Sequence, residues 1–202
     1  MLTVTYRCQH DWDAGAFVAA VGLHVGNTLT ELAVTIECLY GDVETGVAKM
    51  QDFTKLENVE FDARVFCAPS TDSGQRQGMD GTYPSTWTVE ETPCLADILP
   101  ASIKNVDILA GGESHREDGA VLKSLFSHSV DKQRSLLPEL DRLAVRCSEN
   151  AFASLVRTGS AVEGSSGGDT VEALCTVAIE HSESPRPLWK EAFCRRFGAL
   201  GE

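Results

Sequence analysis

The chain has 202 residues and a formal net charge of −13. This length allows one globular domain, which we predict over residues 1–202, to bury its own core without a metal ion or a disulfide. The negative charge argues against binding to nucleic acid or to an anionic membrane, because both need Lys and Arg to neutralise phosphate.

Apolar and polar residues alternate in several segments, as where Val59 and Phe61 alternate with Glu60 and Asp62. Such alternation places one face of a strand on a core and the other face in water. Strands of a buried parallel sheet usually read as continuous apolar runs, so the alternation favours an antiparallel sheet. The strands are predicted at 2–8, 31–40, 45–53, 58–67, 85–91, 106–110 and 170–181.

Three segments predict helices. The first covers 13–25, where Asp13 is placed to cap the helix and Phe17 lies on its apolar face. The second is a long helix at 131–157, where leucines recur at near-helical spacing and the charges suit the helix dipole. The third is a short helix at 186–198 that two prolines introduce.

These elements predict an α+β fold. A mainly antiparallel sheet of about five to seven strands packs against one long helix at about 131–157, with short N- and C-terminal helices. Flexible loops are predicted near 69–85, 111–119 and 159–169, where turn-forming and polar residues gather. No internal repeat is evident, and strands fall on both sides of these loops, so the loops do not mark a domain boundary.

The seven cysteines are odd in number, and no two of them form a C-x-x-C pair. Cys8, Cys38 and Cys175 fall on the apolar phase of predicted strands, where a thiol acts as a small hydrophobic group. These features favour reduced cysteines and a cytoplasmic or nuclear location. The apolar stretch at 14–25 is too short to cross a bilayer.

Three features resemble catalytic motifs but lack the required context. Residues 164–168 fit G-x-S-x-G, yet a nucleophile elbow needs a strand before it and a helix after it. Ser114 and His115 are adjacent in sequence, whereas a nucleophile and its base usually come from separate segments. Cys194 neighbours two arginines, but the end of a helix opposes a thiolate. We therefore predict no particular catalytic residue and no cofactor.

The densest cluster of possible metal ligands is His10, Asp11 and Asp13. A metal site needs three or four converging ligands. Two acidic residues before a helix are explained by capping and by the helix dipole. No metal site is predicted.

The last predicted helix is basic, unlike the rest of the chain. Residues 186–198 carry four Lys or Arg and one Glu, together with an apolar stripe. The stripe either closes the core of the domain or binds a partner, since Trp, Phe and Arg are enriched at the centres of interfaces. The partner-binding candidates are Trp189, Phe193, Arg195, Arg196 and Phe197.

The function predicted from these features is that of a non-enzymatic intracellular interaction protein: an adaptor, an assembly factor or a complex subunit. Its expected partner is a protein, and neither nucleic acid nor a membrane. The alternative is a small-molecule enzyme or ligand carrier that uses a cavity between the curved sheet and the long helix. A small-molecule ligand therefore stays open.

Overall fold

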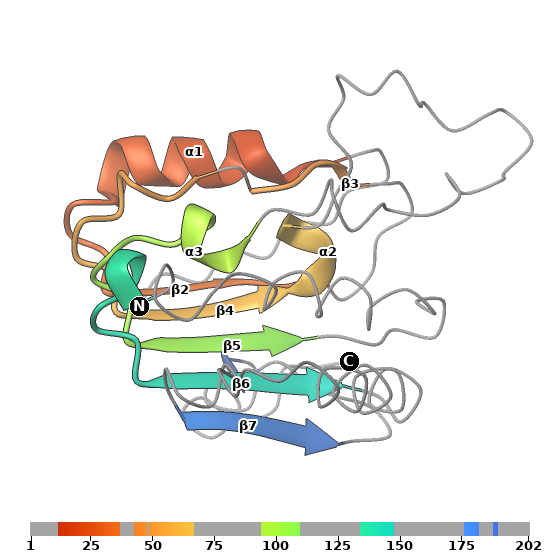
Figure 1. Cartoon of the computed structure of the whole chain (residues 1–202). Helices are drawn as coiled ribbons and strands as arrows, with labels where there is room; N and C mark the ends of the chain where they lie inside the picture. Colours follow the sequence, from red (N-terminus) through yellow and green to blue (C-terminus); the bar gives the residue numbers. More distant parts are fainter. Residues whose placement is uncertain are drawn as a thin grey trace, which may run out of the picture.

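A computed structural model of the protein describes residues 12–36, 43–47, 49–66, 94–109, 134–147, 176–181 and 188–189. Its main feature is a parallel sheet of five strands, which lie side by side in their order along the chain (Figure 1). The strands are β2 (Glu31–Val34), β4 (Asn58–Asp62), β5 (Asn105–Leu109), β6 (Arg142–Cys147) and β7 (Thr176–His181). Each strand of this sheet pairs in parallel with the strand that follows it in the sheet along the chain. The chain therefore returns to the same end of the sheet before each strand, and each new strand is added beside the previous one.

The remaining elements lie before and between these strands. β1 (Trp12–Asp13) pairs in parallel with β3 (Val43–Thr45) in a separate two-stranded sheet. The helices are α1 (Ala14–Val25), α2 (Ala63–Phe66) and α3 (Leu95–Ile98). The Ala16 N–H donates to Asp13 Oδ1 at 2.7 Å, so the predicted helix at 13–25 and its Asp13 cap are confirmed.

The entries to three successive strands repeat one hydrogen-bond arrangement. A carbonyl just before one strand accepts two consecutive N–H groups from the entry to the next strand, at 2.8 to 3.1 Å. The sets are Thr30 with Glu57 and Asn58, Glu57 with Lys104 and Asn105, and Lys104 with Asp141 and Arg142. Glu57 donates to Thr30 and accepts in the next set, and Lys104 does the same one strand further on. The contacts therefore form one continuous series from β2 to β6.

A tight turn precedes each of these entries. The N–H of the residue just before the entry donates to the carbonyl three positions earlier: Leu56 to Phe53, Ile103 to Pro100 and Leu140 to Leu137. The turn and the strand together produce the pattern apolar-x-x-apolar-x-apolar. It recurs at 29–34, 56–61, 103–108 and 140–145, and the sequence repeats it at 174–179. The chain therefore contains an internal repeat, contrary to the prediction from sequence.

The predicted antiparallel sheet is wrong, because every pair in the five-stranded sheet is parallel. Alternation shows that the two faces of a strand differ, and it carries no information about strand direction. Here one face holds the apolar core, while the other carries polar side chains that bond one another. Parallel strands with two such faces alternate just as antiparallel strands do.

The predicted long helix at 131–157 is also wrong over most of the part that is described, 134–147. Residues 134–136 are helical, but a turn then leads into β6. Leu140 and Leu143 are three residues apart, as they would be on one side of a helix. In the structure Leu140 closes the turn and Leu143 lies within the strand. The three-residue spacing between the first two apolar positions of the repeat is therefore the same as a helical spacing.

Four predicted strands, at 31–40, 58–67, 106–110 and 170–181, overlap β2, β4, β5 and β7. The prediction at 58–67 is wrong over its second half, where α2 (Ala63–Phe66) follows β4. The predicted strand at 45–53 holds the end of β3 followed by turns. The predicted strands at 2–8 and 85–91 and the loops near 69–85, 111–119 and 159–169 lie outside the described residues.

The core forms on one face of the five-stranded sheet. Its buried strand residues are Val34, Val59, Phe61, Val106, Ile108, Leu143 and Val145. Residues of all three helices, including Val18, Ala63 and Ile98, belong to the same buried cluster. Since the apolar positions of the repeats at 29–34, 56–61, 103–108 and 140–145 all belong to this cluster or pack against it, burial rather than local propensity holds these strands in place.

α1 approaches the segment before β4 most closely at Gly22. Its buried positions are Ala14, Val18 and Gly22, whereas Phe17, which the sequence placed on the apolar face, is 40% exposed. A Cβ on Gly22 would lie 2.9 Å from the ring of Phe53. Glycine thus allows the helix and the segment to approach closely.

Gly26→Ala is expected to destabilise the fold by about 1–3 kcal/mol, the usual cost of overpacking. A Cβ at this position would lie 2.5 Å from the backbone oxygens of Asp52 and Gly22, and backbone atoms cannot yield as a flexible side chain can. Urea denaturation of the variant beside wild type measures the loss. Leu23→Ala, at a side chain that is 76% exposed on the same helix, is the control. Equal midpoints for Gly26→Ala and wild type would contradict the packing described.

Candidate functional site

The second face of the five-stranded sheet carries polar and charged side chains, and we call it the polar face. Alternation along each strand places these residues opposite the apolar core positions. Its polar members are Asn58, Glu60 and Asp62 of β4, Asn105 and Asp107 of β5, and Arg142 and Arg146 of β6. The in-register pairing aligns them in rows that run across the strands.

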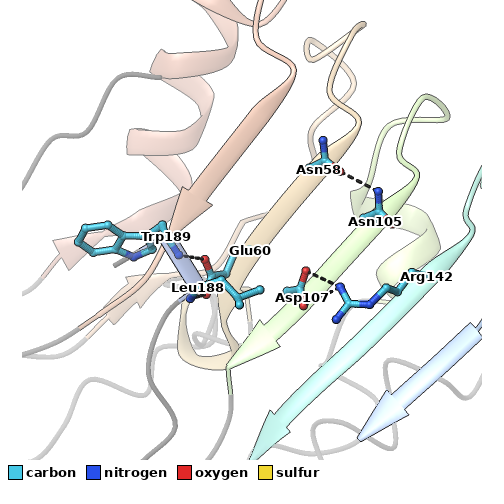
Figure 2. Close-up of polar contacts among 7 residues, drawn as sticks. All are labelled: Asn58, Glu60, Asn105, Asp107, Arg142, Leu188 and Trp189. Atoms are coloured by element: carbon cyan, nitrogen blue, oxygen red, sulfur yellow. Dashed lines mark hydrogen bonds and ion pairs between the residues drawn. The ribbon is translucent and has the colours of Figure 1, made fainter. Parts of the chain in front are cut away.

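Two cross-strand contacts fix side chains on the polar face (Figure 2). Asn105 Nδ2 donates to Asn58 Oδ1 at 2.7 Å. Arg142 Nη1 lies 3.1 Å from each carboxylate oxygen of Asp107, with 34% of the arginine side chain and 12% of the aspartate side chain exposed. The guanidinium therefore remains partly accessible while the aspartate is largely covered by its surroundings.

Glu60 binds a segment from the far end of the chain (Figure 2). The backbone N–H of Leu188 donates to Glu60 Oε1 at 2.6 Å, and that of Trp189 donates to Oε2 at 3.1 Å. The indole Nε1–H of Trp189 donates to Thr35 Oγ1 at 2.7 Å, just beyond β2. Leu188 and Trp189 are helical and half-buried, so this pair of residues is anchored across β4 and the end of β2.

Glu60 is a buried carboxyl group, with 7% of the residue exposed. Burial raises its pKa above the usual value, and the two N–H bonds from Leu188 and Trp189 oppose the rise. The nearby charge of Asp107 raises the pKa further, while that of Arg146 lowers it. The carboxylate is thus held by directed donors against a cost of desolvation.

The chemistry of this face is that of hydrogen bonding and charge recognition. Among the described residues, no group of three or more His, Cys, Asp and Glu is placed to hold a metal ion. No helix in the described part of the chain has the length and apolar character needed to span a membrane. Carboxylates, amides and guanidinium groups in fixed positions suit the binding of a polypeptide.

Of the five partner-binding candidates, Trp189 lies at the site. The other four, Phe193, Arg195, Arg196 and Phe197, fall outside the described residues, as do His10, Asp11, Ser114, His115, 164–168 and Cys194. Trp189 contacts the polar face through its indole and backbone N–H groups, which neither interpretation of the C-terminal helix anticipated.

Glu60, Asp107 and Arg142 were not singled out from the sequence. Glu60 and Asp107 occupy the same place in the repeat, between the last two apolar positions. Alignment of the repeated segments would have placed both residues on one face in adjacent strands. The contact of Glu60 with residues 188–189 leaves no local signal, because the partners are 128 and 129 positions apart.

No protein-family model matches the chain, and searches of curated proteins and of solved structures find no match.

Glu60→Gln is expected to change how stability depends on pH. Because the folded pKa of Glu60 is raised, the folded protein takes up this proton before the unfolded chain does as the pH falls. As the pH falls from neutral to the ordinary pKa of a glutamate, the free energy of unfolding of the wild type therefore rises relative to that of Glu60→Gln. Guanidinium denaturation of both proteins at several pH values measures this difference. Glu57→Gln controls for the loss of one negative charge, and a difference that does not vary with pH would refute the burial of Glu60.

The bond between Trp189 and Thr35 is testable by a double-mutant cycle. Trp189→Phe removes the indole N–H, and Thr35→Val removes the hydroxyl acceptor while keeping a similar shape. We expect a coupling free energy of about 0.5–1.5 kcal/mol, typical of one hydrogen bond. Chemical denaturation of the two single variants, the double variant and wild type provides it. Strict additivity would show that Trp189 does not bond Thr35 in solution.

Proposed function

We propose that the chain is a non-enzymatic protein-interaction protein, an adaptor, assembly factor or complex subunit, that binds a polypeptide segment on its polar face. The observation that carries the proposal is the seating of Leu188 and Trp189 on Glu60. Both oxygens of this buried carboxylate accept backbone N–H groups. Any polypeptide can supply such groups, because every residue other than proline carries one.

The repeated architecture supports this function. Parallel strands in chain order are typical of solenoids, and three of these strands, β4, β5 and β6, are preceded by the same turn. The apolar-x-x-apolar-x-apolar pattern is that of strands in leucine-rich repeats. Solenoids use extended surfaces for binding, since each added repeat enlarges the same face. Here the register extends the polar face over adjacent strands.

Charge complementarity favours a basic segment as the partner. The polar face carries three buried carboxylates, Glu60, Asp62 and Asp107, against the two guanidinium groups of Arg142 and Arg146, so its described charges sum to −1. The whole chain carries a net charge of −13, which steers basic partners towards it. Lys or Arg side chains would meet this charge, and backbone N–H groups would occupy acceptors of the kind that Glu60 provides.

The alternative of a cavity between the sheet and a long helix lacks its helix, because the described part of 131–157 forms one helical turn, a tight turn and a strand. The location in the cytoplasm or nucleus stays a prediction from cysteine usage. Cys94, which lies in the described region, is buried.

Variants at Ala33 test the sign of the charge that the partner carries. Ala33 is exposed on β2 and pairs in register with Glu60, so a substitution there adds charge beside the site without removing a bond. Ala33→Glu is expected to strengthen partner binding and Ala33→Arg to weaken it, each by several-fold, more at low salt than at high salt. The partner is identified by crosslinking of the wild type and mass spectrometry, and its affinity for each variant is measured by calorimetry.

A second pair of variants tests the location of the interface. The double variant Asp107→Asn with Arg142→Gln lacks the ion pair on the polar face. We expect its affinity for the partner to fall by roughly tenfold or more. Glu57→Gln with Lys104→Gln removes an ion pair at 2.8 Å with similar loss of charge, and should have little effect. Equal affinities for the two double variants would place the interface elsewhere and overturn the proposed function.

A further inference from the structure

We infer that the segment containing Leu188 and Trp189 acts as an internal competitor, which occupies the partner's place at Glu60 until the partner displaces it. The inference rests on the proposed function, in which the polar face binds a polypeptide. It adds a means of regulation and a chemical description of the ligand: a turn that presents two consecutive backbone N–H groups and an indole N–H.

The acceptor atoms at this point of the polar face are already used. Oε1 of Glu60 takes the N–H of Leu188 and Oε2 takes that of Trp189, while Thr35 Oγ1 takes the indole N–H. Glu60 retains 7% exposure, so a second polypeptide cannot reach its carboxylate without moving the first. A partner that binds here and the segment at 188–189 therefore exclude each other.

The hydrogen bonds of Leu188 and Trp189 are separate from those that pair the strands. The register of β4 with its neighbours β2 and β5 is maintained by backbone pairing. The hydrogen bonds that these two described residues of the segment make with Glu60 and Thr35, in contrast, use side chains as acceptors. Since the two sets of bonds do not share atoms, the segment can leave without breaking the strands that display the polar face.

The segment and its site are also distant in sequence. A separation of 128 positions between Glu60 and Leu188 means that the contact is held by tertiary interactions alone. A free peptide of the same sequence presents the same donors, so it should bind whenever the internal copy is released. This equivalence allows the competition to be measured before any partner is known.

The decisive variant is Leu188→Pro in the full chain. Proline has no backbone N–H, so this change removes the donor to Glu60 Oε1. Proline is tolerated in the first turn of a helix, so the conformation of the segment is kept. Leu188→Ala retains the N–H and is the matched control. The probe is a fluorescent peptide with the sequence of residues 184–198, and its binding is followed by anisotropy.

We expect the peptide to bind the Leu188→Pro protein roughly tenfold more tightly than wild type or the Leu188→Ala protein. This ratio corresponds to a wild type in which the internal segment leaves Glu60 accessible in about a tenth of the molecules. Adding Glu60→Gln to Leu188→Pro should remove the gain, and a peptide that itself carries Leu188→Pro should bind less well. Equal binding to the wild-type and Leu188→Pro proteins, or binding to neither, would overturn the inference.

The partner, once isolated, separates this inference from the proposed function. If Leu188→Pro leaves partner affinity unchanged while Asp107→Asn with Arg142→Gln abolishes it, internal competition is excluded and binding on the polar face stands. If substitution of Asp107 and Arg142 leaves the affinity for the partner unchanged, the partner does not bind on the polar face. The proposed function is then excluded, whatever the result with the peptide.

Discussion

The two hydrogen bonds that one carbonyl accepts at the entries to β4, β5 and β6 set the register of these strands. They place Thr30, Glu57 and Lys104 at equivalent points of successive repeats. Once the register is set, side chains at equal positions stand next to one another across the strands. The apolar positions then form one continuous core, and the positions between them form the polar face.

The same register explains why the polar face is ordered. Asn58 and Asn105 are directly paired positions of β4 and β5, and their amides meet at 2.7 Å. Glu60 and Asp107 are paired as well, which brings two carboxylates together and leaves the buried Glu60 dependent on outside donors. Leu188 and Trp189 supply those donors. The cost of burying Glu60 is thereby linked to the presence of a bound polypeptide segment.

Burial of a carboxyl group without donors is unfavourable, so the N–H groups of Leu188 and Trp189 offset the cost of burying Glu60. The bonds that pair the strands involve neither Glu60 Oε1 nor Oε2, so the sheet supports this contact without sharing its atoms. Under the function proposed above, a partner that binds at Glu60 would have to replace these donors.

The amino-acid sequence by itself determined the local features of this protein. Asp13 and the apolar residues after it were sufficient to predict the helix at 13–25, because capping and helical periodicity act within a few residues. Alternation located four strands of the sheet in the same way. An alignment of the apolar-x-x-apolar-x-apolar segments would further have revealed the repeat and the shared place of Glu60 and Asp107.

Only the tertiary structure decided the direction of the strands, the fate of the leucines near 140, and the contact between Glu60 and residues 188–189. Alternation describes two faces and not a direction, and the step from Leu140 to Leu143 fits a helix and a turn before a strand equally well. The pairing of Glu60 with Leu188 spans 128 positions and depends on backbone N–H groups, which every non-proline residue carries. No residue type marks such a contact in advance, so it exists only once the chain has folded.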